Sequence, residues 1–137
     1  MTINKEQLIN SDIIKREYKG HKIQQRMIDG YINISPFLKI TGKDFDDYLG
    51  NLMHQDMIQI VCRKENIKQE DLIQNWDSER YKDIPKELDG IWVYPFHAYN
   101  VGFWLGQEEM HFIFYCINDW LKDKEFIESQ EKDMGEA

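Results

Sequence analysis

Residues 29–51 read DGYINISPFLKITGKDFDDYLGN, and this stretch carries the start and stop signals of several elements in succession. Asp29-Gly30 lies between the runs HKIQQRMI and YINI. An Asp-Gly pair supplies the two positive-φ positions of a tight type I′ turn. We therefore expect a β-hairpin that reverses at Asp29-Gly30.

Two short helices are expected next. Ser35-Pro36 has the form of an N-cap followed by proline at the first helical position, where no amide hydrogen is needed. Gly42 can take the left-handed conformation that ends this helix, and Lys43-Asp44 opens a second one. The apolar residues of the second helix share a face: Phe45, Tyr48 and Leu49. Two short helices around a glycine turn form a helix-turn-helix-like unit.

A longer helix and a second hairpin are expected after this unit. Apolar residues recur at helical spacing up to about Lys64, and we assign them to the core: Met53, Met57, Ile60 and Val61. Leu72-Ile73 with Trp76 begins a strand, the charged segment DSERYKDIPKELD forms an exposed loop, and Ile91–Tyr94 returns. The pattern predicts a hairpin over residues 72–94.

Aromatic residues are concentrated between Ile91 and Trp120, which hold 10 of the 18 in the chain. We expect this segment to be the main core, with Trp92 and Trp104 at its centre. Pro95 can start a helix that Gly106 ends. The following helix, 107–121, has an expected inward stripe: Met110, Ile113, Phe114, Ile117 and Leu121.

Three further residues of the 107–121 helix lie outside that stripe: Phe112, Tyr115 and Cys116. A helix that is apolar nearly all round is either fully buried or presents an interface, and the sequence leaves both open. If there is an interface, these three residues form it, and a homodimer is one form it could take.

Two motifs in order carry a family resemblance. The first is Asp29-Gly30-Tyr31-Ile32-Asn33 with the helix pair, and the second is the downstream run Asp89-Gly90-Ile91-Trp92-Val93-Tyr94-Pro95. Together they resemble the KilA-N domain of phages and large DNA viruses, which is similar to the APSES domain of fungal transcription factors. The resemblance covers residues 20–121. It implies an α+β single domain in which small antiparallel hairpins pack with the helix pair and longer C-terminal helices.

The resemblance also implies a regulatory DNA-binding protein of phage, prophage or viral origin. It places the helix pair (Ser35–Leu49) and the 72–94 hairpin, as a wing, near double-stranded DNA. The cations and polar groups available there are the expected DNA contacts: Lys39, Thr41, Lys43, Arg63, Lys64, Lys68, Arg80 and Lys82.

The charge of the chain favours a second interpretation. Net charge is −8, with 11 Lys and Arg against 10 Asp and Glu in residues 1–70, but 6 against 15 in residues 71–137. Family members often carry basic residues in the second helix, whereas this chain has Asp44, Asp46 and Asp47 there. The alternative is therefore an acidic protein-binding or inhibitory module on the same scaffold, engaging a host nucleic-acid-handling protein.

A basic run precedes the first hairpin: Lys15, Arg16, Lys19, Lys22 and Arg26, with His21. It is interpreted either as a solvated strand edge, where lysine discourages aggregation, or as a nucleic-acid contact. Only the position of the run in the fold can decide.

Other chemistry has no support in the sequence. Glu108-x-x-His111 occurs once, although a di-iron site needs a second copy, and His97, His111 and Cys116 match no closed zinc spacing. No phosphate-binding glycine loop or nucleophile elbow is present, so we expect neither an enzyme nor a cofactor or metal.

The remaining expectations concern organisation and location. Residues 1–122 should form one KilA-N-like domain, and residues 123–137 an acidic C-terminal tail that frays. Two lone cysteines, no secretion signal and no long apolar run indicate a cytoplasmic protein, in a bacterial cell or infected host, without a membrane span.

Overall fold

The computed structural model describes residues 4–135, with side chains described as far as Glu125 and at Glu128. In chain order its elements are α1 (Lys5–Ile9), β1 (Ile13–Tyr18), β2 (His21–Arg26), β3 (Ile32–Asn33), α2 (Ser35–Thr41), α3 (Phe45–Leu49), α4 (Leu52–Glu65), α5 (Gln69–Leu72), β4 (Ile73–Trp76), a 3₁₀ helix (Lys86–Leu88), β5 (Gly90–Val93), α6 (Pro95–Leu105) and α7 (Gln107–Gly135). The fold is α+β, as expected.

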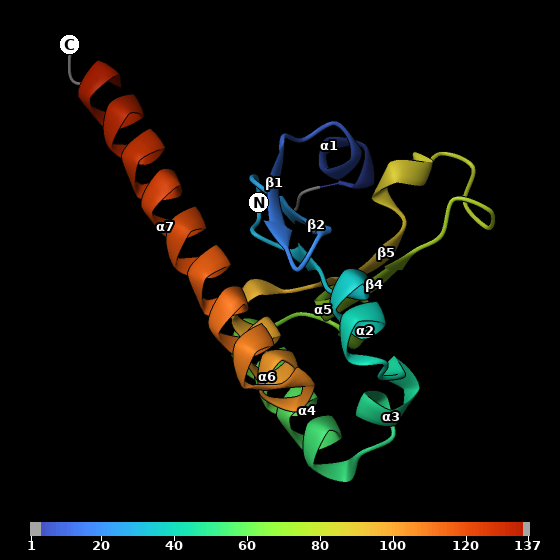
Figure 1. Cartoon of the computed structure of the whole chain (residues 1–137). Coiled ribbons are helices and arrows are strands. Elements are labelled where there is room, and N and C mark those ends of the chain that lie inside the picture. The colour runs from blue at the N-terminus through green and yellow to red at the C-terminus, as the bar shows by residue number, and fades with distance from the viewer. Residues whose placement is uncertain (1–3, 136–137) are drawn as a thin grey trace.

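A five-stranded antiparallel sheet in the order β1-β2-β3-β5-β4 organises the domain (Figure 1). Successive residues of β3 and β5 point to opposite faces of this sheet. Ile32 and Val93 therefore join the larger core cluster with the helices α2 to α7, whereas Trp92 joins a smaller cluster under α1 and the 77–89 segment. Figure 1 shows α2 and α3 to the right of α6 and the long α7 at the left, with its C-terminal part extending away from the body.

Arg26 lies at the centre of the smaller cluster, with a fully buried side chain. Its guanidinium donates to both carboxylate oxygens of Asp29, at 3.0 and 2.8 Å, and to Oε1 of Gln74 at 2.9 Å. The rings of Tyr31, Trp76 and Trp92 surround it, with centroids 4.3, 5.0 and 5.3 Å from Cζ. Burial lowers the pKa of Arg26, and the Asp29 carboxylate acts in the opposite direction. Arg26 is thus a core residue and not part of a solvated basic run.

The hairpin at Asp29-Gly30 forms, but the predicted type I′ turn was wrong. Gly30 has φ of +78°, whereas Asp29 is not among the positive-φ residues, and the amide of Gly30 donates to the carbonyl of Arg26 in a longer loop. The conformation with two positive φ values occurs instead at Lys19-Gly20, with φ of 48° and 79°, between β1 and β2. The Asp29 side chain accepts hydrogen bonds from the buried Arg26 guanidinium, so this loop residue has a structural role other than forming the turn.

The core stripe predicted on α4 was only partly right. Val61 packs against the larger core cluster and Met57 is partly buried, but Met53 and Ile60 are 67% and 48% exposed. The buried residues of α4 are His54, Ile58 and Cys62. Both sets recur at helical spacing, so periodicity alone does not choose between them. The buried face is the one that carries His54, whose ring stacks on Tyr48 with centroids 4.1 Å apart.

The aromatic segment is only partly interior. Pro95 and Gly106 bound α6 as expected, and Trp92 and Trp120 are buried. Several of its other aromatics are exposed: Phe96, Phe103, Phe114 and Tyr115. Much of the larger cluster comes from the first half of the chain, including Ile23, Ile34, Phe37 and Ile58. The main core therefore draws on the whole chain, and Trp104 is half-buried at its margin.

Helix α7 continues to Gly135, so residues 123–135 extend the helix; the end of the expected tail, residues 136–137, lies outside the described residues. On its inward face, Ile113 and Ile117 are buried as expected, but Phe114 is 37% exposed and Cys116 takes an inward position. Trp120 packs over the loop between β2 and β3, and its Nε1 donates to the carbonyl of Met27 at 2.8 Å. A Cβ on Gly30 would lie 2.7 Å from this ring, so the turn requires glycine for space as well as for φ.

Candidate nucleic-acid interface

The helix pair is positioned by local signals that the sequence displays. Pro36 lies in the first turn of α2, and Gly42 follows its last turn with φ of +70°, its amide donating to the carbonyl of Leu38. Asp44 then caps α3, because its carboxylate accepts from the amide of Asp46 at 2.9 Å. The two helices are thus joined by a three-residue turn, Gly42–Asp44.

Ser35 does not cap α2, contrary to the expectation from the Ser-Pro pair. Its Oγ accepts a hydrogen bond from the amide of Ile91 at 3.0 Å, and no side chain caps the helix. Asn33 supports the same junction: its Oδ1 accepts from the amide of Ser35 at 3.1 Å and its Nδ2 donates to the carbonyl of Asp89 at 2.9 Å. We name these contacts the Asn33–Ser35 junction. It ties the helix pair to the last residue of the 77–89 connection and the start of β5.

The β4–β5 hairpin forms as expected, in the register Ile73↔Val93 to Trp76↔Gly90. Its long connection, residues 77–89, is closed by Asp89, whose carboxylate accepts from the amide and hydroxyl of Ser78 at 2.7 and 2.8 Å. Leu88 in the 3₁₀ helix packs beneath it. The wing is therefore an ordered loop attached to the smaller core cluster.

The predicted DNA contacts fall into three groups. Lys39, Thr41 and Lys43 lie on α2 and its turn; Arg63, Lys64 and Lys68 lie at the corner between α4 and α5; Arg80 and Lys82 lie on the wing. All of the cations among them are exposed, and none takes part in the ion pairs seen among the described residues. Thr41 differs, because its hydroxyl donates to the carbonyl of Phe37 at 2.8 Å.

The family model for the KilA-N domain matches residues 15–124 of this chain. The chain belongs to the KilA-N family. KilA-N domains are generally DNA-binding domains. No curated protein and no solved structure matched the chain.

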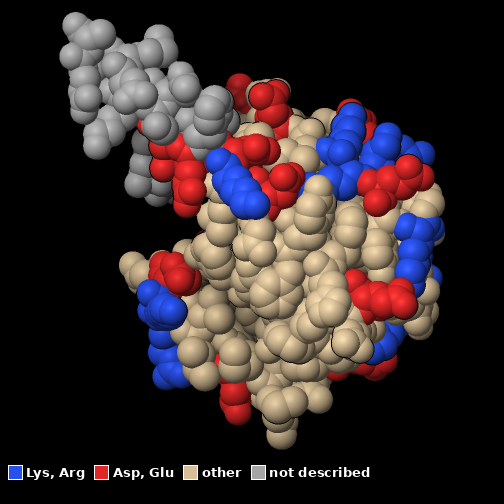
Figure 2. All heavy atoms as spheres, turned by 60° about the vertical axis from the view of Figure 1, so that its left-hand side comes forward, with Lys and Arg blue, Asp and Glu red and all other residues tan. Residues whose placement is uncertain are grey.

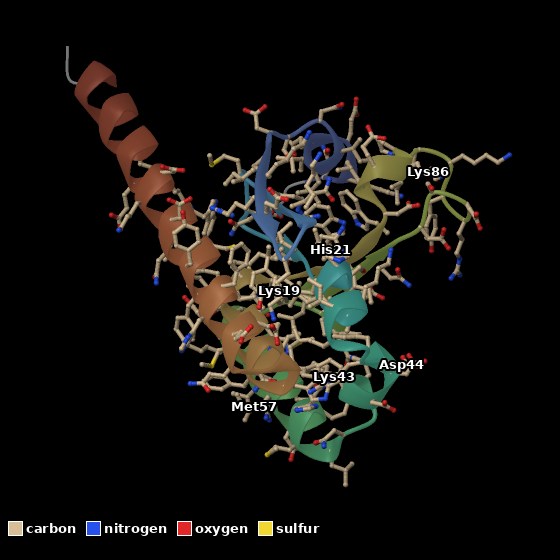
Figure 3. The ribbon with its side chains drawn as sticks, viewed as in Figure 1. Lys19, His21, Lys43, Asp44, Met57 and Lys86 are labelled. Atoms are coloured by element: carbon tan, nitrogen blue, oxygen red, sulfur yellow. The ribbon has the colours of Figure 1, made fainter. Side chains whose placement is uncertain are left out.

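In this KilA-N domain the two charged residues of the α2–α3 turn, Lys43 and Asp44, are both exposed but point in different directions. The Nζ of Lys43 donates to the carbonyl of Trp104 and lies 5.1 Å from the centre of its ring. Figure 3 shows Lys43 directed toward α6 and Asp44 directed outward from the turn. Lys43 is thus less available for a phosphate than its place in the sequence suggests.

The basic run before the first hairpin is largely committed to intramolecular contacts. Arg16 pairs with Asp119 at 2.7 Å, and Lys19 pairs with Glu108 at 2.6 Å. Lys15 and Lys22 are exposed on β1 and β2. A solvated strand edge and a nucleic-acid contact both require exposed cations without an intramolecular partner. Of the residues in this run, Lys15 and Lys22 meet that requirement among the described ion pairs.

The wing carries a further exposed lysine, Lys86, that is not among the predicted DNA contacts. Lys86 lies in the 3₁₀ helix, and Figure 3 shows it pointing away from the body. The signal was present, because Lys86 stands in the same charged segment as Arg80 and Lys82.

A polar network is buried behind the helix pair of the KilA-N domain. The hydroxyl of Tyr48 donates to Oδ1 of Asn100 at 2.6 Å and lies 2.8 Å from Nε2 of His97. Burial lowers the pKa of His97 to about 4, which keeps the ring neutral near pH 7. His97 therefore acts as a packing residue that joins α6 to α3.

The three predicted interface residues occupy different environments. Cys116 is fully buried, so assigning it to an interface was wrong; burial raises the pKa of its thiol to about 11. Phe112 is half-buried, with its ring 4.6 Å from that of Tyr18. Tyr115 is 57% exposed.

Figure 2, in which the side with α7 is turned forward, shows a broad area at its centre without Lys, Arg, Asp or Glu. Exposed aromatics of α6 and α7 also include Phe103 and Phe114.

Within the described residues, no helix is both long and apolar enough to cross a membrane.

Proposed function

We propose that this KilA-N domain binds double-stranded DNA through α2, the α4–α5 corner and the wing. The observation that carries the proposal is the family match over residues 15–124, because KilA-N domains generally bind DNA. Lys39, Arg63, Lys64, Lys68, Arg80 and Lys82 supply the phosphate contacts, with Lys86 added. We further propose a regulatory role for a protein of phage, prophage or viral origin in the cytoplasm of a bacterial cell or infected host.

The test is a salt titration of duplex binding by fluorescence anisotropy. We expect wild type to bind at about 50 mM salt, where electrostatic contacts are weakly screened. Lys39→Glu combined with Lys64→Glu should weaken binding to all sequences and reduce the slope of log K against log salt by about 0.9 for each lost contact. Lys43→Ala should have a smaller effect than Lys39→Ala, because the Lys43 ammonium is held by Trp104.

The matched control is Lys122→Glu with Lys124→Glu, which makes the same change in charge on α7. We expect it to leave binding and slope unchanged. Equal losses from both double variants would mean that only total charge matters, and no binding by wild type would refute the proposal.

A second candidate is the acidic module that binds a host nucleic-acid-handling protein. The observation that favours it is the α2–α3 turn, where the exposed Lys43 is directed toward α6 while Asp44 is directed outward and Asp46 and Asp47 are exposed. This candidate predicts no change in the fluorescence anisotropy of any duplex even at low salt. The same titration therefore separates the DNA-binding function from the protein-binding one.

We also propose that two copies of the chain associate through the outer face of α6 and α7. Phe103, Phe114 and Tyr115 are 65%, 37% and 57% exposed on these helices. Figure 2 shows a broad area without charged residues on this side of the molecule, and contiguous apolar patches of large area often mark association surfaces. Sedimentation velocity should show a wild-type dimer and a Phe103→Glu monomer, with Lys122→Glu as a dimeric control. A wild-type monomer would contradict the proposal. Phe112→Glu is a poor test, because Phe112 packs on Tyr18.

A further inference from the structure

A groove lies between the helix pair and the end strand of the sheet. One wall is the segment from Leu38 to Leu49, and the opposite wall is α5, with Gln69 and Glu70. The floor is formed by Ile73 and Asn75 of β4 and by Ile91 of β5. The cavity volume is about 830 Å³. This is within the range of sites that hold a small ligand or a few side chains of a peptide.

The inner surface of the groove is mostly apolar. Leu38, Phe45 and Leu49 face it from the helix pair, and Ile73 and Ile91 face it from the sheet. Apolar side chains inserted here would be removed from water, which is the main source of binding free energy in such sites.

The charged residues around the groove are predominantly acidic. Asp44, Asp46 and Glu70 line it, against the single cation Lys43. The Lys43 ammonium is directed to the Trp104 carbonyl and ring, and its single charge is outnumbered by the three carboxylates. A phosphate would be repelled here, whereas Lys or Arg side chains at the ends of a bound segment would be attracted.

The position of β4 in the sheet favours an extended ligand. β4 is the last strand in the order, paired with β5 on one side. The outer side of such a strand presents backbone N–H and C=O groups that can pair with an added strand. A segment paired there would direct alternate side chains over Ile73 and Asn75.

We propose that this groove binds an extended segment of a protein partner in which lysine or arginine alternates with large apolar residues. The apolar side chains occupy the floor, and the cations contact Asp44, Asp46 and Glu70. This binding does not rest on the DNA contacts proposed above, because Lys39, Arg63, Lys64, Lys68, Arg80, Lys82 and Lys86 do not line the groove.

The test uses the full chain and a short labelled peptide of alternating lysine and leucine, followed by fluorescence anisotropy. Asp44→Asn with Glu70→Gln should weaken binding by about tenfold at low salt. Asparagine is also an effective N-cap, so this variant should keep α3. The matched control, Asp47→Asn with Asp56→Asn, removes the same charge from exposed positions that do not line the groove. It should change binding by less than about twofold.

Two further measurements locate the peptide. Replacing leucine by serine should abolish binding, and amide chemical shifts of wild type should change at Gly42, Ile73 and Asn75 and not at Phe103. Equal losses from both double variants, no binding by wild type, or shifts confined to α6 and α7 would each overturn the proposal. Because the peptide carries no phosphate and the DNA test alters only lysines, either proposal can fail while the other stands.

Discussion

Trp92→Ala is expected to lower the free energy of unfolding by about 3–5 kcal/mol, the usual cost of deleting a large buried ring. Trp92 is fully buried, its ring lies 5.6 Å from that of Trp76, and its Nε1 donates to the carbonyl of Leu88 at 2.9 Å. The substitution therefore removes the contact between β5 and the wing as well as one wall around Arg26.

Urea denaturation followed by circular dichroism measures this loss. Leu52→Ala is the control, because Leu52 is 83% exposed, lies outside the proposed dimer surface, and its removal should cost less than about 0.5 kcal/mol. Trp104→Ala should fall between the two, since Trp104 is half-buried. If Trp92→Ala is too unstable to purify, Trp92→Phe should still show a partial loss. A Trp92→Ala midpoint equal to that of wild type would show that the smaller cluster contributes little to stability.

Asp29→Ala should be comparably severe, at about 3–5 kcal/mol, because it leaves the buried Arg26 guanidinium without its counter-charge. Both carboxylate oxygens of Asp29 accept from Arg26, whose side chain has no exposed area. Removing an exposed acid instead, as in Asp47→Ala, should cost little.

A double-mutant cycle separates the charge from the packing. Arg26→Met with Asp29→Ala should be more stable than Asp29→Ala alone, because a buried apolar side chain needs no partner. A double variant that is less stable than Asp29→Ala would show that the contacts of Arg26 with Gln74 and the three rings matter more than its charge.

Local signals predicted the elements around the candidate site well. Proline at the start of α2 and α6, glycine after α2 and α6, and the apolar residues of β4 and β5 are signals that each depend on a few adjacent residues. The family match covers the same region and confirms the recognition made from its two motifs.

The errors arose where distant residues decide. The direction of Lys43 depends on Trp104, which lies 61 positions later, and the buried state of Arg26 depends on the rings of Trp76 and Trp92 from β4 and β5. The buried face of α4 was misassigned because His54, a polar residue by type, is a packing residue here. Lys19 was not expected in a left-handed conformation, since non-glycine residues adopt it rarely.

The Asn33–Ser35 junction has a consequence for how the domain meets any ligand that spans the helix pair and the wing. Ser35 and Asn33 join α2 directly to Ile91 and Asp89, so the spacing between the two surfaces is set before the ligand arrives. Little ordering entropy is then lost by the protein on binding, and the conformational adjustment falls on the ligand. A duplex or a peptide that does not fit this spacing has to bend, and the energy of that bending becomes a means of selection.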